Sequence, residues 1–252
     1  MFVITGGGSG LGQALALALA QRQCQVLIVG RREQTLQETA RQNANITYYC
    51  ADVSEEGGRQ RLANHLLAQP DLQGLIHNAG IIEPIMPLRS LTLENWRACM
   101  RTNVEAPLFL TQLLWSKLSK ARVLHIGSGA AYLAITGWAA YCVSKAGLAM
   151  LTRCWQAEYP TLAVASVMPG IVDTPMQTSI RASEHMALDK HEFFCRLKTT
   201  HQLLSAATVA CFLEWLLLDA APEIYGSQEW DIYDAQHHSQ WLKPPHVVPQ
   251  IT

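Results

Sequence analysis

Short apolar segments alternate with longer segments of helical periodicity along the chain. The apolar segments, each expected to form a strand, are Phe2–Ile4, Gln25–Val29, Ile46–Cys50, Gly74–His77, Arg122–Ile126, Leu162–Val167 and Gln228–Ile232. Helices are expected from Leu11 onward and over Glu33–Asn43, 55–69, 92–119, Tyr141–Tyr159 and Ala206–Leu218. The helix over 92–119 is expected to be interrupted near residues 101–103. Apolar strands that alternate with helices are typical of a parallel sheet buried on both faces. The pattern predicts a single α/β domain, doubly wound, with a mainly parallel sheet of seven strands and helices on both faces.

A glycine-rich turn separates the first strand from the first helix. It reads Thr5-Gly6-Gly7-Gly8-Ser9-Gly10-Leu11-Gly12, with glycines in the spacing G-x-x-x-G-x-G. Glycines let the backbone approach a pyrophosphate closely, and the unpaired N–H groups at a helix start attract its charge. The turn therefore favours a nucleotide as ligand, and a tight turn without a ligand is the alternative.

Polar residues and glycines follow several of the other strands. The third strand leads to Ala51-Asp52-Val53, the fourth to Asn78-Ala79-Gly80, the fifth to Gly127-Ser128 and the sixth to Pro169-Gly170. Ligands of such sheets bind beyond the carboxyl ends of the strands. We therefore expect these segments to line one site together with the glycine turn.

The composition argues against several other kinds of protein. The apolar fraction of 49% is ample for a core, and the net charge of −1 gives no electrostatic reason to expect nucleic acid or a membrane surface as a partner. The seven cysteines include no C-x-x-C pair, which predicts reduced thiols, a cytoplasmic location and no metal site. We find no basic leader before the first strand and no apolar segment of membrane-spanning length.

The second strand ends in Gly30-Arg31-Arg32 rather than in an acidic residue. An Asp or Glu about 20 residues beyond the glycine turn binds the ribose 2′-hydroxyl of NAD, and it would repel a 2′-phosphate. A guanidinium instead binds a phosphate through two parallel hydrogen bonds. The arginines therefore favour NADP(H) over NAD(H). Either of them could turn toward the phosphate, and a solvated surface pair is the alternative.

Tyr141 and Lys145 are four residues apart and share one face of the expected helix. Ser128 lies 13 residues before Tyr141, at the end of the fifth strand. Together with the glycine turn, Asn78-Ala79-Gly80 and Pro169-Gly170, these residues resemble the classical short-chain dehydrogenase/reductase family, which has a Rossmann-type fold. The resemblance runs in order from residue 2 to about residue 175.

The resemblance implies hydride transfer between NADP(H) and a small carbonyl or alcohol substrate. It implies that Tyr141 is the general acid in reduction and the general base in oxidation, and that Ser128 hydrogen-bonds the substrate oxygen, with Ser144 as the alternative serine. Lys145 would bind the nicotinamide ribose and, with the nicotinamide ring, lower the phenol pKa from its usual value of about 10. Asn103 would interrupt a helix and hold a water molecule for proton relay, or else be an ordinary helix residue.

The resemblance also implies a set of cofactor-binding residues. Asp52 would contact the adenine with Val53 beside the ring, or would instead cap the following helix. Thr174 would contact the nicotinamide carboxamide. The complete expected set is Gly6, Ser9, Gly10, Leu11, Gly12, Arg31, Arg32, Asp52, Val53, Asn78, Ala79, Gly80, Tyr141, Lys145, Pro169, Gly170, Val172 and Thr174.

A few positions depart from the common pattern of the family. His77 replaces an asparagine and is expected to be structural, and Ser9 stands where many NADP-using members have a basic residue. The strand Gln228–Ile232 lacks the frequent glycine-rich ending. Tyr132 and Tyr159 are expected only to pack.

The expected organisation is a cofactor half at 1–120, a catalytic and substrate half at 121–235, and a tail at 236–252. Residues 171–205 are expected to form a mobile lid over the substrate, and Gly137-Trp138-Ala139 to form part of the pocket wall. The expected substrate is a compact ketone, diketone or aldehyde, and the chain is similar in style to sepiapterin and benzil reductases.

Two helices of this fold, at about 103–118 and 141–159, usually pack against a second subunit. The resemblance therefore implies a homodimer or homotetramer, with which the low charged fraction of 15% agrees. The alternative function is that of a regulatory protein that senses NADP(H) without turnover. The complete set of Ser128, Tyr141 and Lys145 argues against this alternative, because a sensor has no use for a proton donor.

Overall fold

The computed structural model describes residues 1–251, and Thr252, the end of the expected tail, lies outside the described residues. All seven predicted strands form, and they pair in one parallel sheet of order β3-β2-β1-β4-β5-β6-β7. The strands are β1 (Phe2–Thr5), β2 (Val26–Gly30), β3 (Ile46–Cys50), β4 (Gly74–His77), β5 (Arg122–Ile126), β6 (Ala163–Met168) and β7 (Trp230–Asp231).

Helices follow each of the first six strands. They are α1 (Gly10–Gln21), α2 (Glu33–Ala40), α3 (Glu56–Leu67), α4 (Leu93–Met100), α5 (Ala106–Leu113), α6 (Ala139–Glu158), α7 (Pro175–Arg181), α8 (Leu188–Thr199), α9 (Ala206–Leu218), α10 (Pro222–Tyr225) and α11 (His238–Trp241). Short helical turns are η1 (Leu88–Ser90), η2 (Arg101–Glu105), η3 (Trp115–Lys117), η4 (Gly129–Ala131) and η5 (Ala235–His237), of which η2 is π-helical.

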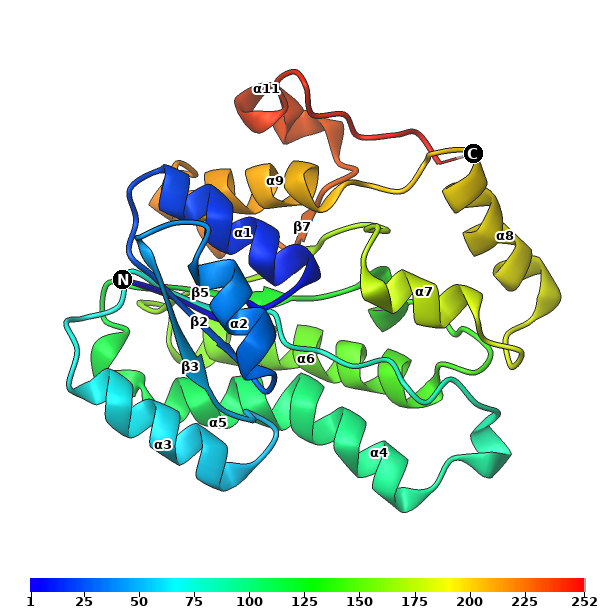
Figure 1. Ribbon diagram of the computed structural model, residues 1–252, viewed down its shortest axis with the longest axis horizontal. Helices are drawn as coiled ribbons and strands as arrows, with labels where there is room; N and C mark the ends of the chain where they lie inside the picture. Colours follow the sequence, from blue (N-terminus) through cyan, green and yellow to red (C-terminus); the bar gives the residue numbers. More distant parts are fainter. Residues whose placement is uncertain (252) are drawn as a thin grey trace.

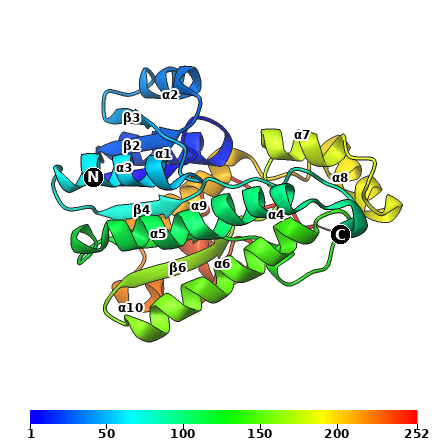
Figure 2. The same ribbon diagram turned by 90° about the horizontal axis from the view of Figure 1, so that it is seen from below.

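Helices cover both faces of the sheet, as the apolar strands predict. α1 and α9 pack against each other over one face (Figure 1), and α3, α5 and α6 lie on the other (Figure 2). Each face has its own apolar core. Leu15 and Leu213 are fully buried in the first core, and Leu62 and Leu110 are fully buried in the second. The fold is therefore the predicted Rossmann-type arrangement.

The expected helix over residues 92–119 is divided into α4, η2, α5 and η3. The π-helical turn η2 confirms the interruption near residues 101–103 and contains Asn103, which is buried. The last strand is shorter than the predicted Gln228–Ile232, because only Trp230 and Asp231 pair with β6. This leaves Glu229, just before β7, outside the strand pairing.

The C-terminal tail packs on its own chain. α11 lies over α9 (Figure 1), and Trp241 is buried in an aromatic cluster with Phe212 and His237. The tail then returns to the end of α8, where Gln202 Nε2 donates a hydrogen bond to the carbonyl of Gln250 at 3.1 Å. Ile251 packs against the apolar cluster that contains Trp138 and Phe194.

The structure shows the surroundings of His77, Tyr159 and Tyr132. His77 is buried, and its Nε2 lies 2.9 Å from the hydroxyl of Thr111. Burial and the neighbouring His125 hold the pKa of His77 well below its usual value, so that the ring is neutral and structural, as predicted. Tyr159 packs between the rings of Trp115 and Trp155. The prediction that Tyr132 only packs is wrong, because this side chain is 51% exposed and bonds to Glu229 and Arg153.

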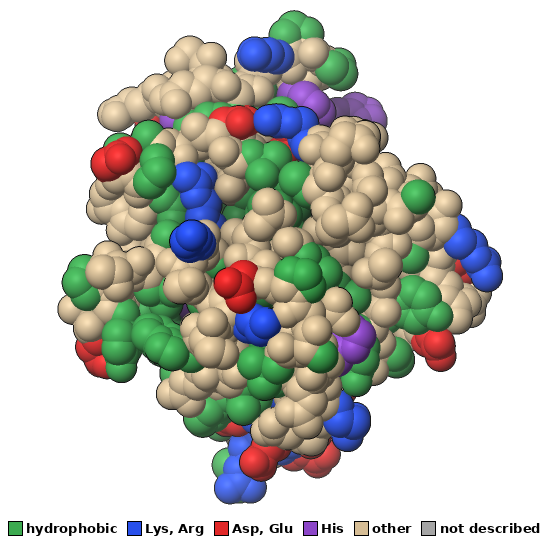
Figure 3. All heavy atoms as spheres, turned by 90° about the vertical axis from the view of Figure 1, so that its left-hand side faces the viewer, with side chains coloured by type: hydrophobic (Ala, Val, Ile, Leu, Met, Phe, Trp, Pro, Cys, Tyr) green, Lys and Arg blue, Asp and Glu red, His purple; other side chains and the backbone are tan. Residues whose placement is uncertain are grey.

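Basic, acidic and apolar side chains are interspersed on the side of the molecule that carries the N-terminus (Figure 3). Such a mixed surface agrees with the net charge of −1. Within residues 1–251, none of the helices combines the length and the apolar character that crossing a membrane requires.

Candidate active site

The glycine turn forms a cradle in front of α1. Gly6 and Gly10 have φ angles of +70° and +56°, a left-handed conformation that favours glycine. A Cβ atom on Gly12 would lie 2.4 Å from the carbonyl oxygen of Gly6, so that no side chain fits there. Asn78 fixes the turn, because its Nδ2 donates hydrogen bonds to the carbonyls of Thr5 and Gly6 at 2.9 and 3.2 Å. The turn therefore has the open backbone that a phosphate requires.

The start of α1 is open to an anion. Ser9 is its N-cap residue, but the Ser9 side chain makes no capping hydrogen bond. Its Oγ instead accepts a hydrogen bond from Arg32 Nη2 at 3.4 Å. Gly10 and Leu11, the first residues of the helix, border a large cavity. Their unpaired N–H groups are of the kind that bind phosphate at helix starts.

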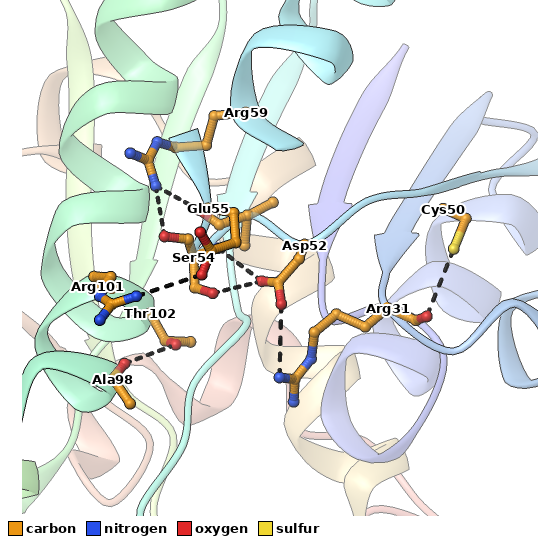
Figure 4. A network of polar contacts seen from close by, with 10 residues as sticks. Arg31, Cys50, Asp52, Ser54, Glu55, Arg59, Ala98, Arg101 and Thr102 are labelled. Carbon is orange, nitrogen blue, oxygen red and sulfur yellow. Dashed lines mark hydrogen bonds and ion pairs between the residues drawn. The ribbon is translucent and has the colours of Figure 1, made fainter. Parts of the chain in front are cut away.

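The two arginines after β2 point to different partners. Arg31 turns toward Asp52, with 3.7 Å between Nη1 and Oδ2 (Figure 4), whereas Arg32 bonds to Ser9 at the glycine turn. Asp52 also accepts hydrogen bonds from the amide and hydroxyl of Ser54 at 2.9 and 2.7 Å. The alternative that Asp52 caps the following helix is wrong, because Glu55 is the N-cap residue of α3.

The loop that carries Asp52 is held from behind by Arg59. Arg59 is 6% exposed, and its Nη1 donates hydrogen bonds to the carbonyls of Val53 and Ser54 at 2.9 and 3.0 Å (Figure 4). Gly58 allows the loop to approach α3, because a Cβ there would lie 1.9 Å from the Asp52 carbonyl oxygen. Asp52 and Val53 are thereby fixed at the edge of the cavity.

Ser128, Tyr141 and Lys145 lie together at the carboxyl end of β5. Ser128 precedes η4 and hydrogen-bonds Tyr141, whose side chain is on the first turn of α6. Lys145 follows one turn later, with Nζ 5.7 Å from the centre of the Tyr141 ring. Lys145 Nζ donates a hydrogen bond to the carbonyl of Ile126 at 2.6 Å. Both Tyr141 and Lys145 are buried, while each still borders the cavity.

Burial dominates the proton affinities of this pair. It raises the pKa of Tyr141 to about 12, and the hydrogen bond from Ser128 acts in the opposite direction but more weakly. Burial also lowers the pKa of Lys145 to about 8. The pKa of Tyr141 is thus raised in the structure, whereas the family resemblance implied a lowered pKa. The reason is that desolvation of the phenol outweighs the interaction with Ser128. Tyr141 is therefore a protonated phenol at neutral pH, which suits a proton donor.

Both polar atoms of the Asn103 side chain form hydrogen bonds within the protein. Its Oδ1 accepts a hydrogen bond from the amide of Ile81, and its Nδ2 donates to the Ile81 carbonyl and to Ser144 Oγ, each at 2.9 Å. Ser144 also donates to the Tyr141 carbonyl at 2.8 Å and is fully buried, which leaves Ser128 as the serine at the cavity. Asn103 therefore joins α6 to the segment after β4.

The expected site residues gather around one cavity of about 870 Å³, which extends from the glycine turn to Tyr141. Two of them do not border it: Gly12 lies behind the glycine turn, and Asn103 lies behind Gly80. The others that line it are Gly6, Ser9, Gly10, Leu11, Arg31, Arg32, Asp52, Val53, Asn78, Ala79, Gly80, Ser128, Tyr141, Lys145, Pro169, Gly170, Val172 and Thr174.

The other end of the cavity is apolar and aromatic. Trp138, at the start of α6, stacks on Phe194 of α8 with 5.5 Å between ring centres, and Phe193 lies beside them. Gly137 and Ala139, which were expected in the wall, do not border the cavity. Ile82 does so and was missed in the sequence, although it follows the Asn78-Ala79-Gly80 segment closely.

Comparisons with known proteins show the family of the chain. Residues 1–185 match the short chain dehydrogenase family, and the chain belongs to that family. An uncharacterized oxidoreductase of Schizosaccharomyces pombe is 33% identical, over 91% of this chain and 96% of that protein. A benzil reductase ((S)-benzoin forming) of Bacillus cereus is 32% identical, over 85% of this chain and 92% of that protein.

Solved structures show the same fold. The crystal structure of the KRED1-Pglu enzyme superimposes with a TM-score of 0.85 at 28% identity and covers 92% of this chain and 99% of its own. A gluconate 5-dehydrogenase from Beutenbergia cavernae, described as putative and NAD(P) dependent, was solved with bound NADP. It has a TM-score of 0.78 at 26% identity and covers 91% of this chain and 93% of its own. The chain is thus an oxidoreductase of the short-chain dehydrogenase type.

Among residues 1–251, no group of three or more His, Cys, Asp or Glu side chains is arranged to hold a metal ion. The polar groups of the cavity instead suit an organic cofactor with phosphates, since the glycine turn, an uncapped helix start and two arginines border it together.

Proposed function

We propose that this protein reduces a small ketone or aldehyde to an alcohol, or carries out the reverse reaction, with NADP(H) as cofactor. The observation that carries the proposal is the single cavity, in which the glycine cradle at one end is continuous with Ser128, Tyr141 and Lys145 at the other. The glycine turn and Arg32 would hold the phosphates, while Lys145 would hold the nicotinamide ribose. When bound, NADPH supplies a hydride.

The side chains of the protein would complete the reduction. Ser128 would donate a hydrogen bond to the carbonyl oxygen, where negative charge develops. Tyr141 would donate its proton to the same oxygen, since the phenol is protonated at neutral pH and borders the cavity beside Ser128. Trp138 and Phe194 would exclude water from the reacting groups. The role of Asn103 in holding a relay water stays a prediction.

Turnover with a panel of carbonyl compounds tests this function. Benzil is the first substrate to try, because two relatives from Bacillus are named benzil reductases, and small aldehydes and simple ketones complete the panel. We expect the absorbance of reduced nicotinamide to decay with at least one of them. Binding of NADPH without decay across the whole panel would support the alternative of an NADP(H) sensor.

The preference for NADP(H) rests on Arg32 rather than on Arg31. Arg31 is paired with the carboxylate of Asp52, and so one positive and one negative charge offset each other there. Arg32 contacts Ser9, a neutral residue at the glycine turn, and no carboxylate among residues 1–251 lies within 4.0 Å of its guanidinium. We therefore assign the 2′-phosphate to Arg32 and Ser9, and a role beside the adenosine to Arg31.

Replacing Arg32 should weaken NADPH binding selectively. A hydrogen bond to a charged group contributes about 1.5–3 kcal/mol, so that Arg32→Ala should raise the Kd of NADPH about tenfold to a hundredfold. The Kd of NADH should change by less than about twofold, because NADH lacks the 2′-phosphate. Titration of nicotinamide fluorescence measures both constants without turnover. Arg31→Ala is the matched control, and an equal rise for both cofactors in Arg32→Ala would contradict the assignment.

We also propose that the protein is a homodimer or homotetramer. Exposed apolar side chains gather on α5, α6 and the segment between them, since Phe109, Trp115, Val143 and Met150 are 39%, 44%, 48% and 55% exposed. A second subunit that packs on these helices would cover such side chains. Sedimentation of the wild-type chain should give two or four times the mass of 27.9 kDa. Met150→Glu should shift the protein toward the monomer, and a monomeric wild-type protein would refute the proposal.

A further inference from the structure

The carboxylate of Glu229 lies close to both the first and the last residue of the turn that carries Ser128. The turn begins at Gly127 after β5, continues through η4 and ends at Tyr132. Glu229 reaches it from the segment before β7, far away in the sequence. A Cβ on Gly127 would lie 3.4 Å from Glu229 Oε1, which shows how close this carboxylate is to the start of the turn. Its other oxygen, Oε2, accepts a hydrogen bond from the Tyr132 hydroxyl at the end of the turn.

Two further groups fix Glu229 and Tyr132 in this arrangement. The hydroxyl of Ser166, a residue of β6 that is 3% exposed, donates a hydrogen bond to Glu229 Oε1 at 2.8 Å. Arg153 of α6 donates to the Tyr132 hydroxyl at 3.2 Å. These side chains thus connect the turn to β6, to α6 and to the segment before β7.

Besides the packing of Ala130, which is buried in one cluster with Trp138 and Tyr141, the turn makes few other hydrogen bonds. The Gly127 amide bonds to the carbonyl of Val167 at 2.8 Å, and the Ala130 amide bonds to Ser128 Oγ at 3.1 Å. The Ala131 and Tyr132 amides bond back to Ser128 and Gly129 within the turn. None of these bonds connects the far end of the turn to another element, whereas the bond from Tyr132 to Glu229 does.

We propose that Glu229 is a positioning residue that, through Tyr132, holds Ser128 at the distance from Tyr141 that the reaction requires. The proposal rests on the proposed function, because it gives Ser128 a role in binding the substrate oxygen. Loss of the carboxylate releases the end of the turn, and a serine displaced by a fraction of an ångström stabilises the developing charge less well. The glycine cradle is built from other elements and is unaffected.

Kinetics of Glu229→Ala, Glu229→Gln and Tyr132→Phe test the proposal. We expect Glu229→Ala and Tyr132→Phe to lower kcat about tenfold, with the Kd of NADPH unchanged. Glu229→Gln keeps an acceptor oxygen and should recover most of the loss. The double variant Glu229→Ala/Tyr132→Phe should be no slower than either single variant, because the two residues act through one contact. Tyr48→Phe is the matched control, since Tyr48 bonds to Glu33 at 3.4 Å in a second exposed pair.

Two outcomes would overturn the positioning role. One is a wild-type kcat in Glu229→Ala while Ser128→Ala is inactive, which leaves the proposed function intact. The other is a parallel loss of kcat, NADPH affinity and melting temperature, which would mean that Glu229 only stabilises the fold. If Ser128→Ala itself keeps its full kcat, the role of Ser128 fails, and the positioning role fails with it, whereas the proposed function fails only if the wild-type protein turns over none of the carbonyl panel.

Discussion

Tyr141→Phe is expected to abolish carbonyl reduction while NADPH still binds. The substitution removes one hydroxyl, which is the group that borders the cavity with Ser128 and whose pKa burial raises to about 12. Loss of a positioned proton donor lowers rates by a factor of about 10² to 10⁴, and we expect about a thousandfold lower kcat here. Steady-state kinetics with the best carbonyl of the panel measure the loss, and fluorescence titration measures the Kd of NADPH.

The variant is conservative enough to make the result clear. Phenylalanine keeps the ring that contacts Trp138 edge-on at 5.8 Å, so that the wall of the cavity is preserved. Tyr233→Phe is a control, because its hydroxyl accepts a hydrogen bond from the Ile171 amide at 3.2 Å and is remote from Ser128 in the hydrogen-bond network. Turnover by Tyr141→Phe at more than about a tenth of the wild-type rate would exclude Tyr141 as the proton donor.

Lys145→Met should inactivate the enzyme and at the same time stabilise its fold. Burial lowers the pKa of Lys145 from 10.5 to about 8. Relative to the neutral amine, the ammonium is therefore less favourable in the folded protein than in the unfolded chain, by on the order of 3 kcal/mol. Methionine lacks this charge and has a similar length. It does lose the hydrogen bond to the Ile126 carbonyl, which costs about 1 kcal/mol. The net effect should be a melting temperature several degrees higher at pH 7.

The same argument gives a pH dependence with a definite sign. Between pH 8 and 10.5 the unfolded chain binds the lysine proton more strongly than the folded protein does. The stability of the wild-type protein therefore rises with pH in this window, relative to Lys145→Met. Thermal unfolding of both proteins at pH 7 and at pH 10 should show a smaller difference at the higher pH. A variant that is less stable than the wild type at pH 7 would contradict the assigned burial cost.

The sequence predicted the strands and the catalytic group well because both depend on local patterns. A continuous apolar run such as Val26–Val29 is typical of a strand covered on both faces, and Gly30 marks its end. Tyr141 and Lys145 are four residues apart on one helix, so that their proximity follows from helix geometry alone. Asp52 was undecided between two roles, and the position of Glu55 as N-cap residue removed one of them.

Other features depend on contacts that no local pattern reports. Tyr132 and Glu229 are 97 residues apart, and their bond joins the turn after β5 to the segment before β7, two strands that flank β6 in the sheet. The helices α7 and α8, between residues 171 and 205, were not predicted. α8 follows Ala187, an N-cap residue without a capping side chain, and mixes charged with aromatic residues. The different directions of Arg31 and Arg32 also required the structure.

The path of the tail has a consequence for the order in which the protein is assembled in the cell. Ile251 packs with Trp138 and Phe194 at the aromatic end of the cavity. Ile251 is synthesised after all the residues that line the cavity, whereas the segment from β1 to α3 emerges from the ribosome well before it. The elements around the glycine turn are therefore available first, and the aromatic end of the cavity receives its last packing partner late.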